Sequence, residues 1–377
     1  MRCDYHDRGV CRSCTLLAIP HPDQVAAKQA AVAAVLASAA PGVRWLEPVS
    51  GPDHGFRNKA KLVAEGSVGE VSLGILGPDG RGVDLRECGL HDPAIATALP
   101  RLSAVIDDIG LIPYAVPTRR GELKHVVVTA APTGELMIRF VLRSTHHEAL
   151  LRSRLPRLLE AMPTTRVVSL NIQPKPAAIL AGEREIVLTQ QDSLRMPIGP
   201  VPLHLPPDAF FQTNTAVATA LYAQARAWVV ESAPRTVWDL YCGVGGFALH
   251  AAGPGRVVAG VEIAAGAIAA ARRSAAELGL DPGLARFAAG DASAAYDLLP
   301  GPPDLVVVNP PRRGLDPGLV AWLDACPADT LVYSSCNPVT LARDLAGLAT
   351  WRAREARLFD MFPHTDHHEV AVVCDRS

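Results

Sequence analysis

From residue 236 onward, short apolar segments alternate with helical patterns. The strand-like segments are "TVWDLYC", "VVAGVEI", "ARFAAGD", "PDLVVVNPP", "TLVYSSC" and "HEVAVVC", and segments such as "AGAIAAARRSAAELG" and "VTLARDLAGL" lie between them. Continuous apolar runs are typical of strands buried on both faces, and their alternation with helices is typical of a parallel sheet covered on both sides. The sequence therefore predicts an α/β fold here, with a doubly wound, Rossmann-like sheet.

The N-terminal half has a different texture. Residues 22–40 predict an Ala-rich helix ended by Pro41-Gly42, and "NKAKLVAEGSVGEVSLGIL" and "HVVVTAAPTGELMIRFVL" each predict a hairpin around a glycine-containing break. The Pro-rich stretch "PIGPVPLHLPP" precedes the next helical pattern. We therefore predict a mixed α+β domain over 1–205 and a catalytic domain over 206–377.

Composition narrows the possible locations and partners. No apolar run is long enough to span a bilayer, and the polar start "MRCDYHDRGVCRSC" lacks the apolar core of a secretory signal, which favours the cytoplasm. We expect the protein to bind no membrane and to need no obligate protein partner. The formal net charge of -2 is unusual for a nucleic-acid-binding protein. However, locally basic segments provide candidate phosphate contacts at Lys59, Lys61, Arg119, Arg120 and Lys124.

A cofactor site is predicted where the strands end. Glycines at 243, 245 and 246 follow the first strand, and Glu262 ends the next strand about 20 residues further on, where such folds place an acid that binds ribose hydroxyls. Asp291 and Asn309 end the third and fourth strands. Each of these polar residues alone could be a helix cap. The glycine pattern is incomplete and no phosphate-binding lysine follows it, which favours S-adenosylmethionine over NAD or ATP.

The motif "SSCNP" places Cys336 at the end of the fifth strand. Asn337 suits a helix N-cap and Pro338 the first helical position, so the thiol is expected beside a helix N-terminus, which favours the thiolate. A thiolate that adds to carbon 6 of uracil activates carbon 5 for methylation, and a base must then remove the carbon 5 proton. Glu369 is the predicted base, with His367 and His368 as alternatives. The competing interpretation is a buried structural cysteine.

Four other cysteines form a possible metal site. Cys3, Cys11 and Cys14 cluster at the start of the chain, and Cys88 follows after a long loop. Four thiolates suit zinc and an iron-sulfur cluster equally well, and their spacing does not decide between them. In either case, we expect the metal to attach residues 1–15 to the middle part of the N-terminal domain.

Five motifs together resemble a known family. "FFQTN", "DLYCGVGGF", "VNPPRRG", "SSCNP" and "HHEV" are similar, in this order, to motifs of the RNA uracil carbon 5 methyltransferases, and most similar to the group that methylates a uridine in 23S ribosomal RNA. The resemblance extends from Cys3 to the C-terminus. One departure from the wider family is Asn309, where an aspartate is usual.

The resemblance implies a role for each motif residue. It implies that Cys336 is the nucleophile and Glu369 the proton acceptor. It also implies that S-adenosyl-L-methionine binds to Gln212, Tyr241, Gly243, Glu262, Asp291 and Asn309. Finally, it implies a 4Fe-4S cluster held by Cys3, Cys11, Cys14 and Cys88.

The predicted substrate is an unstacked or flipped-out uridine of 23S ribosomal RNA, because carbon 5 must leave the base stack to react. Two alternatives remain at this point. One is the same reaction on transfer RNA or on another ribosomal uridine. The other is a non-catalytic RNA-binding metalloprotein that keeps the fold.

Overall fold

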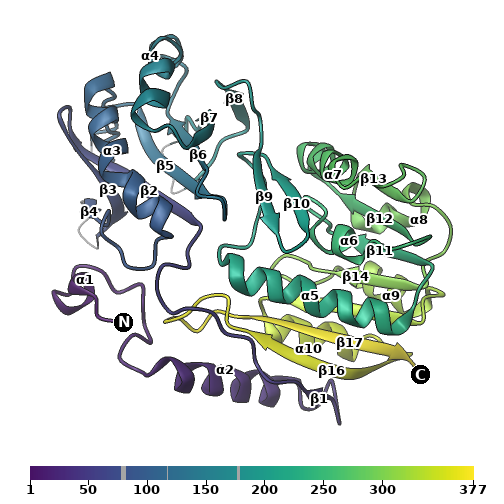
Figure 1. Cartoon of the computed structure of the whole chain (residues 1–377). Helices are drawn as coiled ribbons and strands as arrows, with labels where there is room; N and C mark the ends of the chain where they lie inside the picture. Colours follow the sequence, from purple (N-terminus) through teal and green to yellow (C-terminus); the bar gives the residue numbers. More distant parts are fainter. Residues whose placement is uncertain (78–81, 117, 176–178) are drawn as a thin grey trace. The chain divides into compact units, whose positions relative to one another are not determined.

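The computed structural model describes residues 1–77, 82–116, 118–175 and 179–377, and these form two compact units (Figure 1). The first unit contains residues 1–14, 52–196 and 206–208, and the second contains 15–51, 197–205 and 209–377. This division differs from the predicted boundary at 205/206. It assigns residues 15–51 and 197–205 to the unit that carries the catalytic motifs.

A mixed sheet of eight strands forms the centre of the second unit, all of whose residues are described. Its strand order is β1-β16-β17-β15-β14-β11-β12-β13. The strands are β1 (Arg44–Trp45), β11 (Thr236–Leu240), β12 (Val257–Glu262), β13 (Ala285–Ala289), β14 (Leu305–Val308), β15 (Thr330–Ser335), β16 (Trp351–Phe359) and β17 (Glu369–Arg376). Neighbouring strands from β13 to β15 are parallel, whereas β17 is antiparallel to both β15 and β16. The predicted doubly wound sheet is therefore confirmed.

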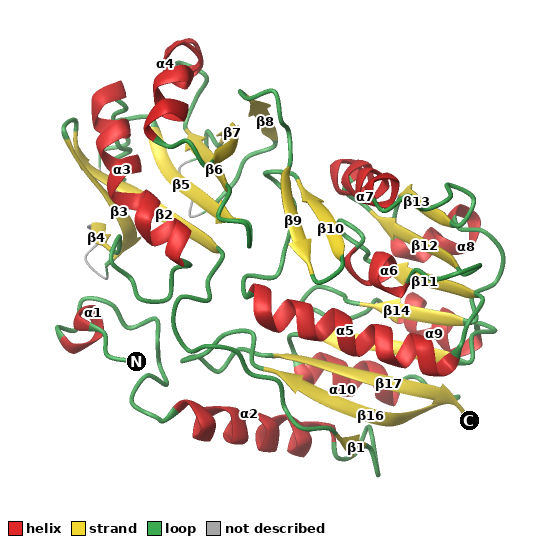
Figure 2. Ribbon diagram, viewed as in Figure 1, coloured by secondary structure: helices red, strands yellow, loops and turns green. Residues whose placement is uncertain are grey.

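Helices cover both faces of this sheet (Figure 2). Their bounds are α2 (His21–Leu36), α5 (Thr215–Ser232), α6 (Gly246–Ala251), α7 (Ala265–Glu277), η1 (Ala292–Ala294), α8 (Ala295–Leu298), α9 (Pro317–Ala325) and α10 (Pro338–Ala346). Side chains of α2, α8, α9 and α10 share one apolar core with the strands. Helices α5, α6 and α7 contact other strand residues.

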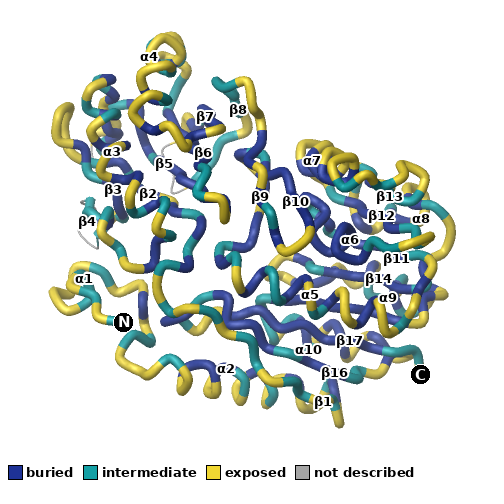
Figure 3. The backbone as a smooth tube through the Cα atoms, viewed as in Figure 1, coloured by how far each residue is buried: buried dark blue, intermediate teal, exposed yellow. Residues whose placement is uncertain are grey.

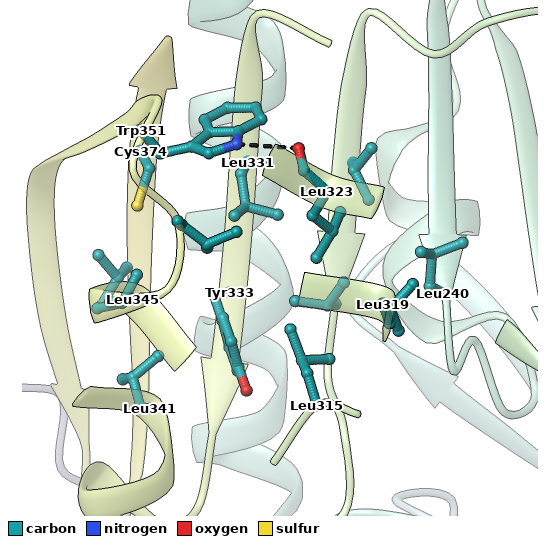
Figure 4. Close-up of a cluster of buried hydrophobic side chains, with 14 of the residues drawn as sticks. Leu240, Leu315, Leu319, Leu323, Leu331, Tyr333, Leu341, Leu345, Trp351 and Cys374 are labelled. Atoms are coloured by element: carbon teal, nitrogen blue, oxygen red, sulfur yellow. Dashed lines mark hydrogen bonds between the residues drawn. The ribbon is translucent and has the colours of Figure 1, made fainter. Parts of the chain in front are cut away.

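Strand and helix side chains interlock in the core shared by α9, α10 and β15 (Figure 4). Leu323 of α9, Leu341 of α10 and Leu331 of β15 are fully buried there. Trp351 donates its indole N–H to the carbonyl oxygen of Leu323 at 3.1 Å. Strand β17 is buried along most of its length (Figure 3) and β15 along all of it, as their continuous apolar sequences predict.

Segment 15–51 joins the catalytic unit for two reasons. Strand β1 pairs in parallel with β16 at the edge of the sheet, and α2 packs against α10. Val25, Val32 and Leu36 of α2 lie in the shared core at helical spacing. The sequence did not reveal β16, because its segment "WRAREARLF" carries charged side chains that mask the apolar pattern.

The first unit contains a sheet whose order, within the described residues, is β4-β3-β2-β5-β6-β7-β8. Its elements are α1 (Asp4–Asp7), β2 (Lys59–Ser67), β3 (Glu70–Leu76), β4 (Gly82–Asp84), α3 (Pro93–Ile109), β5 (Leu123–Ala130), β6 (Leu136–Leu142), α4 (Glu148–Ala161), β7 (Thr165–Ile172) and β8 (Arg184–Val187). The two predicted hairpins are confirmed as the antiparallel pairs β2–β3 and β5–β6. Helices α3 and α4 share the apolar core on one face of this sheet.

A separate pair, β9 (Leu194–Ile198) and β10 (Val201–Leu205), forms a two-stranded sheet. Strand β10 also packs against α7, which accounts for the place of residues 197–205 in the second unit. In the part of the chain that the structure describes, none of the helices has the length and hydropathy needed to cross a bilayer.

Candidate active site

Polar groups gather at one edge of the catalytic sheet. Because β11, β12, β14 and β15 are parallel, their carboxyl ends lie at the same edge, where β17 begins in the opposite direction. The last pair between β15 and β17 is Ser335 with Val370. Strand β15 ends at Ser335, one residue before Cys336, and β17 begins at Glu369. The predicted nucleophile and base therefore lie at neighbouring ends of two adjacent strands.

Glu369 is buried, with 3% of its surface exposed, and its hydrogen bonds orient it. Its Oε1 accepts hydrogen bonds from the Ser334 hydroxyl at 2.7 Å and from Asn309 Nδ2 at 2.9 Å. Burial raises the pKa of Glu369 to about 7, while these two hydrogen bonds act to lower the pKa. A carboxyl group with this pKa changes its charge near neutral pH, which suits a general base.

Cys336 lies half-buried at the predicted helix terminus. Asn337 caps α10, because its Oδ1 accepts from the Val339 N–H at 3.1 Å, and Pro338 occupies the first turn. The pKa of the Cys336 thiol is nevertheless raised, first by burial and then by the Glu369 charge, although Arg312 acts to lower it. Burial therefore acts against the thiolate that the helix terminus is expected to favour, and that expectation stays a prediction.

The glycine-rich loop after β11 has left-handed backbone angles and borders open space. Gly243 and Gly245 have φ angles of 53° and 86°, in the region that favours glycine, and Tyr241 shares it with a φ of 69°. Glu262 faces this loop, because its Oε2 accepts from the Gly243 N–H at 3.3 Å. A side chain built on Gly243 would meet no atom within 4 Å, so the loop borders open space.

Two site residues were not predicted from the sequence. Asp239 lies on β11, fully buried; its Oδ2 accepts from the Ala248 N–H at 2.9 Å, and its Oδ1 has no hydrogen-bond partner among the described residues. Burial raises its pKa to about 8. Tyr222 of α5 is stacked on His250 and lies close enough to both Asp239 and Glu369 for their charges to raise its pKa. The acid within an apolar strand was the available signal for Asp239, whereas Tyr222 has the pattern of a core residue.

The remaining predicted cofactor residues occupy different environments. Asp291 caps η1 by accepting hydrogen bonds from Ser293, the alternative that the sequence left open for it. Gln212 is buried in the segment before α5. Asn309 uses one side-chain N–H for the Ser334 carbonyl oxygen at 3.0 Å and the other for Glu369. Its amide is therefore part of the framework around the base.

The alternative bases are less suitable than Glu369. His367 is exposed, with its ring against Phe362. His368 is buried, its Nδ1 lies 2.9 Å from the Asp366 carbonyl oxygen, and its pKa is lowered by burial.

The four N-terminal cysteines gather in the first unit. Burial raises the pKa of the Cys14 thiol to about 11, with further contributions from the charges of Cys88, Cys11 and Cys3. By their chemistry, four thiols form a donor set that suits an iron-sulfur cluster or zinc. However, no three metal-binding side chains within the described residues are arranged as a metal site.

The predicted phosphate contacts divide into two groups. Lys124 does not fit the prediction, because its buried Nζ donates to Gln173 Oε1 and to the Lys175 carbonyl oxygen. In contrast, Lys61 is exposed on β2, and charge from Lys61 and Arg139 contributes to lowering the Lys59 pKa to about 8, mainly an effect of burial.

The fold and the residues at this sheet edge define an S-adenosylmethionine-dependent methyltransferase. The protein has a doubly wound sheet, a glycine-rich loop after β11 and an acid at the end of β12.

The sequence profile described as tRNA (Uracil-5-)-methyltransferase matches residues 302–377. A protein of Edwardsiella ictaluri named 23S rRNA (uracil(747)-C(5))-methyltransferase RlmC is 47% identical over 378 residues, covering 100% of both chains. An Escherichia coli protein of the same name is 46% identical over 371 residues, covering 98% of both chains. The chain belongs to the RNA uracil carbon 5 methyltransferase family.

A solved structure supports the same assignment. The crystal structure of Pyrococcus abyssi tRNA (uracil-54, C5)-methyltransferase in complex with S-adenosyl-L-homocysteine has a TM-score of 0.80 and 26% sequence identity to this chain. The similarity covers 97% of this chain and 86% of the archaeal one. The likeness therefore includes both units and extends beyond the catalytic sheet.

Proposed function

We propose that this protein methylates carbon 5 of a uridine in 23S ribosomal RNA, with S-adenosylmethionine as the methyl donor. The observation that carries the proposal is the buried Glu369, with a pKa of about 7, at the start of the strand next to the one that ends just before Cys336. The RlmC relatives, named for uracil 747 of 23S rRNA, support this substrate because they match nearly the whole chain.

Cys336 forms the covalent bond to the base. Its half-exposed thiol gives its proton to solvent, and the sulfur adds to carbon 6 of uracil. The carbon 5–carbon 6 double-bond electrons move toward the carbonyl oxygen at carbon 4, giving an enolate. S-adenosylmethionine would supply an electrophilic methyl group when bound. Carbon 5 forms the new carbon–carbon bond with that electron pair, while the methyl–sulfonium bond breaks and its electrons stay on the leaving sulfur. The exposed side chain of Arg312 and the positive charge of the cofactor both favour the thiolate.

Glu369 completes the reaction as base. It takes the proton from carbon 5, the electrons of that C–H bond re-form the double bond, and the sulfur–carbon 6 bond breaks with its electron pair returning to Cys336. Ser334 and Asn309 both bind Oε1, so Oε2 receives neither of these hydrogen bonds. Oε2 is the oxygen that we assign to the proton transfer.

The residues at the strand ends fit the cofactor. Glu262 is placed to accept hydrogen bonds from ribose hydroxyls, and the open space beside Gly243 allows close backbone approach. Asp239 Oδ1, which has no hydrogen-bond partner within the described residues, is a further candidate for a cofactor contact. Tyr241, Asp291, Gln212 and Asn309 stay predicted contacts.

The RNA substrate distinguishes this proposal from its alternatives. We expect a uridine that is unstacked before it reaches Cys336, because the reacting carbon is hidden in a duplex. Labelled S-adenosylmethionine should transfer its methyl group to unmethylated 23S rRNA, giving 5-methyluridine, with no label in 16S rRNA or transfer RNA. Label in transfer RNA alone would favour the substrate of the archaeal structural neighbour, whereas no label in any RNA would favour a non-catalytic binding protein.

Replacement of the base provides a direct test of the mechanism. Glu369→Gln should still methylate once, but it should accumulate a covalent protein–RNA adduct, because the carbon 5 proton stays in place. The adduct is measured as a denaturation-resistant band that contains RNA. A matched control is Glu355→Gln, which replaces another buried glutamate of the same unit and should form no such band. Cys336→Ala should form no adduct, either alone or combined with Glu369→Gln. An adduct formed by a protein with Cys336→Ala would contradict the nucleophile assignment.

We propose that Cys3, Cys11, Cys14 and Cys88 hold a 4Fe-4S cluster. Support comes from the Cys14 and Cys88 thiols, whose pKa values are raised first by burial and further by the charges of other cysteines of this set. Protein purified without oxygen should be brown, with broad absorbance near ~400 nm and equal amounts of iron and sulfide. Cys14→Ser should lose the iron, whereas Cys326→Ser, a buried thiol of the other unit, should keep it. Zinc without iron would contradict the proposal.

A further inference from the structure

The loop of residues 360–368 connects β16 to β17 and leads directly to Glu369. Three residues of α2 restrain this loop, although α2 lies near the start of the chain. They are His21, Gln24 and Lys28. His364 has a φ of 67°, a conformation that non-glycine residues rarely adopt. The position of the base therefore depends on contacts that hold this loop in an otherwise unfavourable shape.

Lys28 of α2 makes the central contact. It is 5% exposed, and its Nζ donates to Asp360 Oδ1 at 2.6 Å, to the Phe362 carbonyl oxygen at 3.1 Å and to the His367 carbonyl oxygen at 3.2 Å. An ammonium group has three N–H bonds, so these acceptors use all of them. Asp360 is fully buried, so removal of Lys28 would leave its carboxylate with His21 as the remaining ion-pair partner within the described residues and without the ammonium charge.

Two further residues of α2 complete the restraint. His21 Nε2 lies 2.7 Å from the other Asp360 oxygen. Gln24 Oε1 accepts from the His364 N–H at 2.8 Å, and its Nε2 lies 3.2 Å from His364 Nδ1. Helix α2 therefore contacts the start, the middle and the end of the loop.

We infer that Lys28 is a positioning residue for Glu369. A single ammonium group binds both Phe362, near the start of the loop, and His367, two residues before the base, and so fixes the distance between them. This inference rests on the proposed role of Glu369 as proton acceptor. Because proton transfer needs accurate placement, a shift of about 1 Å in such a group can cost on the order of 100-fold in rate.

The test replaces Lys28 with methionine, which has a similar length but no charge and no donor. Cofactor binding and the first methyl transfer should be nearly unchanged, because Cys336 and the glycine-rich loop do not contact α2 through these bonds. Steady-state turnover should fall about 10-fold or more, and protein–RNA adduct should accumulate. A purely structural role would reduce the first turnover and the steady state by the same factor, without adduct, and that outcome would overturn the inference.

Controls separate this inference from the proposed function. Glu355→Gln removes a buried charge elsewhere on β16 and should accumulate no adduct. Adduct in Glu369→Gln but not in Lys28→Met would reject the positioning role alone, whereas adduct in neither would reject the base assignment. If Lys28→Met does not fold, Lys28→Arg is the second test, because it keeps a positive charge beside Asp360 but its planar guanidinium cannot reproduce three bonds from one nitrogen. Turnover of Lys28→Arg equal to the wild type, without adduct, would then overturn the inference.

Discussion

At the scale of single residues, burial determines the chemistry of Glu369. The carboxyl is surrounded by protein, which raises its pKa to about 7, and the hydrogen bonds from Ser334 and Asn309 limit that rise. The sequence predicted Asn309 only as a cofactor contact. The structure shows that both of its side-chain N–H groups are used, one for the Ser334 carbonyl and one for Glu369, so its amide also sets the orientation of the base.

The pH dependence of adduct breakdown follows from this environment. A base acts only when ionised, so breakdown should slow as the pH falls through about 7 and level off above it. Asn309→Ala removes a hydrogen bond to the charged form, so the midpoint should move to higher pH. Breakdown of preformed adduct is followed by quench at several pH values, which separates this step from cofactor binding. An unchanged or lower midpoint would contradict the assigned role of Asn309.

At the scale of elements, the start of α6 depends on a close approach by α5. A Cβ atom built on Gly246 would lie 2.6 Å from Tyr222 Oη and 2.7 Å from its Cζ. Tyr222 cannot easily move aside, because its ring is stacked on His250 and meets the Phe247 ring edge to face. The glycine-rich loop therefore owes its position to packing as well as to backbone freedom.

Gly246→Ala should consequently destabilise the protein by about 1–3 kcal/mol, because the added methyl group overpacks a filled site. We also expect weaker S-adenosylmethionine binding, since the overlap displaces the loop. Urea unfolding and calorimetric titration measure the two effects. The control is Gly266→Ala in α7, where the added Cβ meets no atom within 4 Å, and this change should be neutral or slightly stabilising. Equal stability of the two variants would contradict the packing argument.

At the scale of the whole molecule, the first unit supplies a cationic surface despite the net charge of -2. Ala60, Leu62 and Ala64 of β2 face the apolar core beneath α3 and α4, so Lys59 and Lys61 point to the other face of the sheet. Arg139 of β6 influences the pKa of both lysines from that face. Because Arg139 is paired with Glu185, the repulsion that a polyanion such as an RNA backbone would relieve is mainly that between Lys59 and Lys61.

Lys61→Ala should therefore weaken RNA binding and reduce the slope of log affinity against log salt by about 1. Titration of labelled RNA at several salt concentrations measures both quantities. Arg154→Ala removes the same charge from α4, which covers the opposite face, and should leave the slope unchanged. Equal slopes for Lys61→Ala and the wild type would place the RNA elsewhere.

The sequence by itself determined the features that local patterns encode. Apolar runs and helical spacing predicted the doubly wound sheet, the two hairpins and the cap at Asn337, because each depends on residues close together in the chain. Topology then placed Cys336 and Glu369 at one edge, because β15 ends where the antiparallel strand β17 begins. Only the tertiary structure decided the environment of these residues. The raised pKa values of Cys336 and Glu369 result from burial, and the contact of Lys28 with Asp360 joins residues 332 positions apart, which no local pattern can reveal.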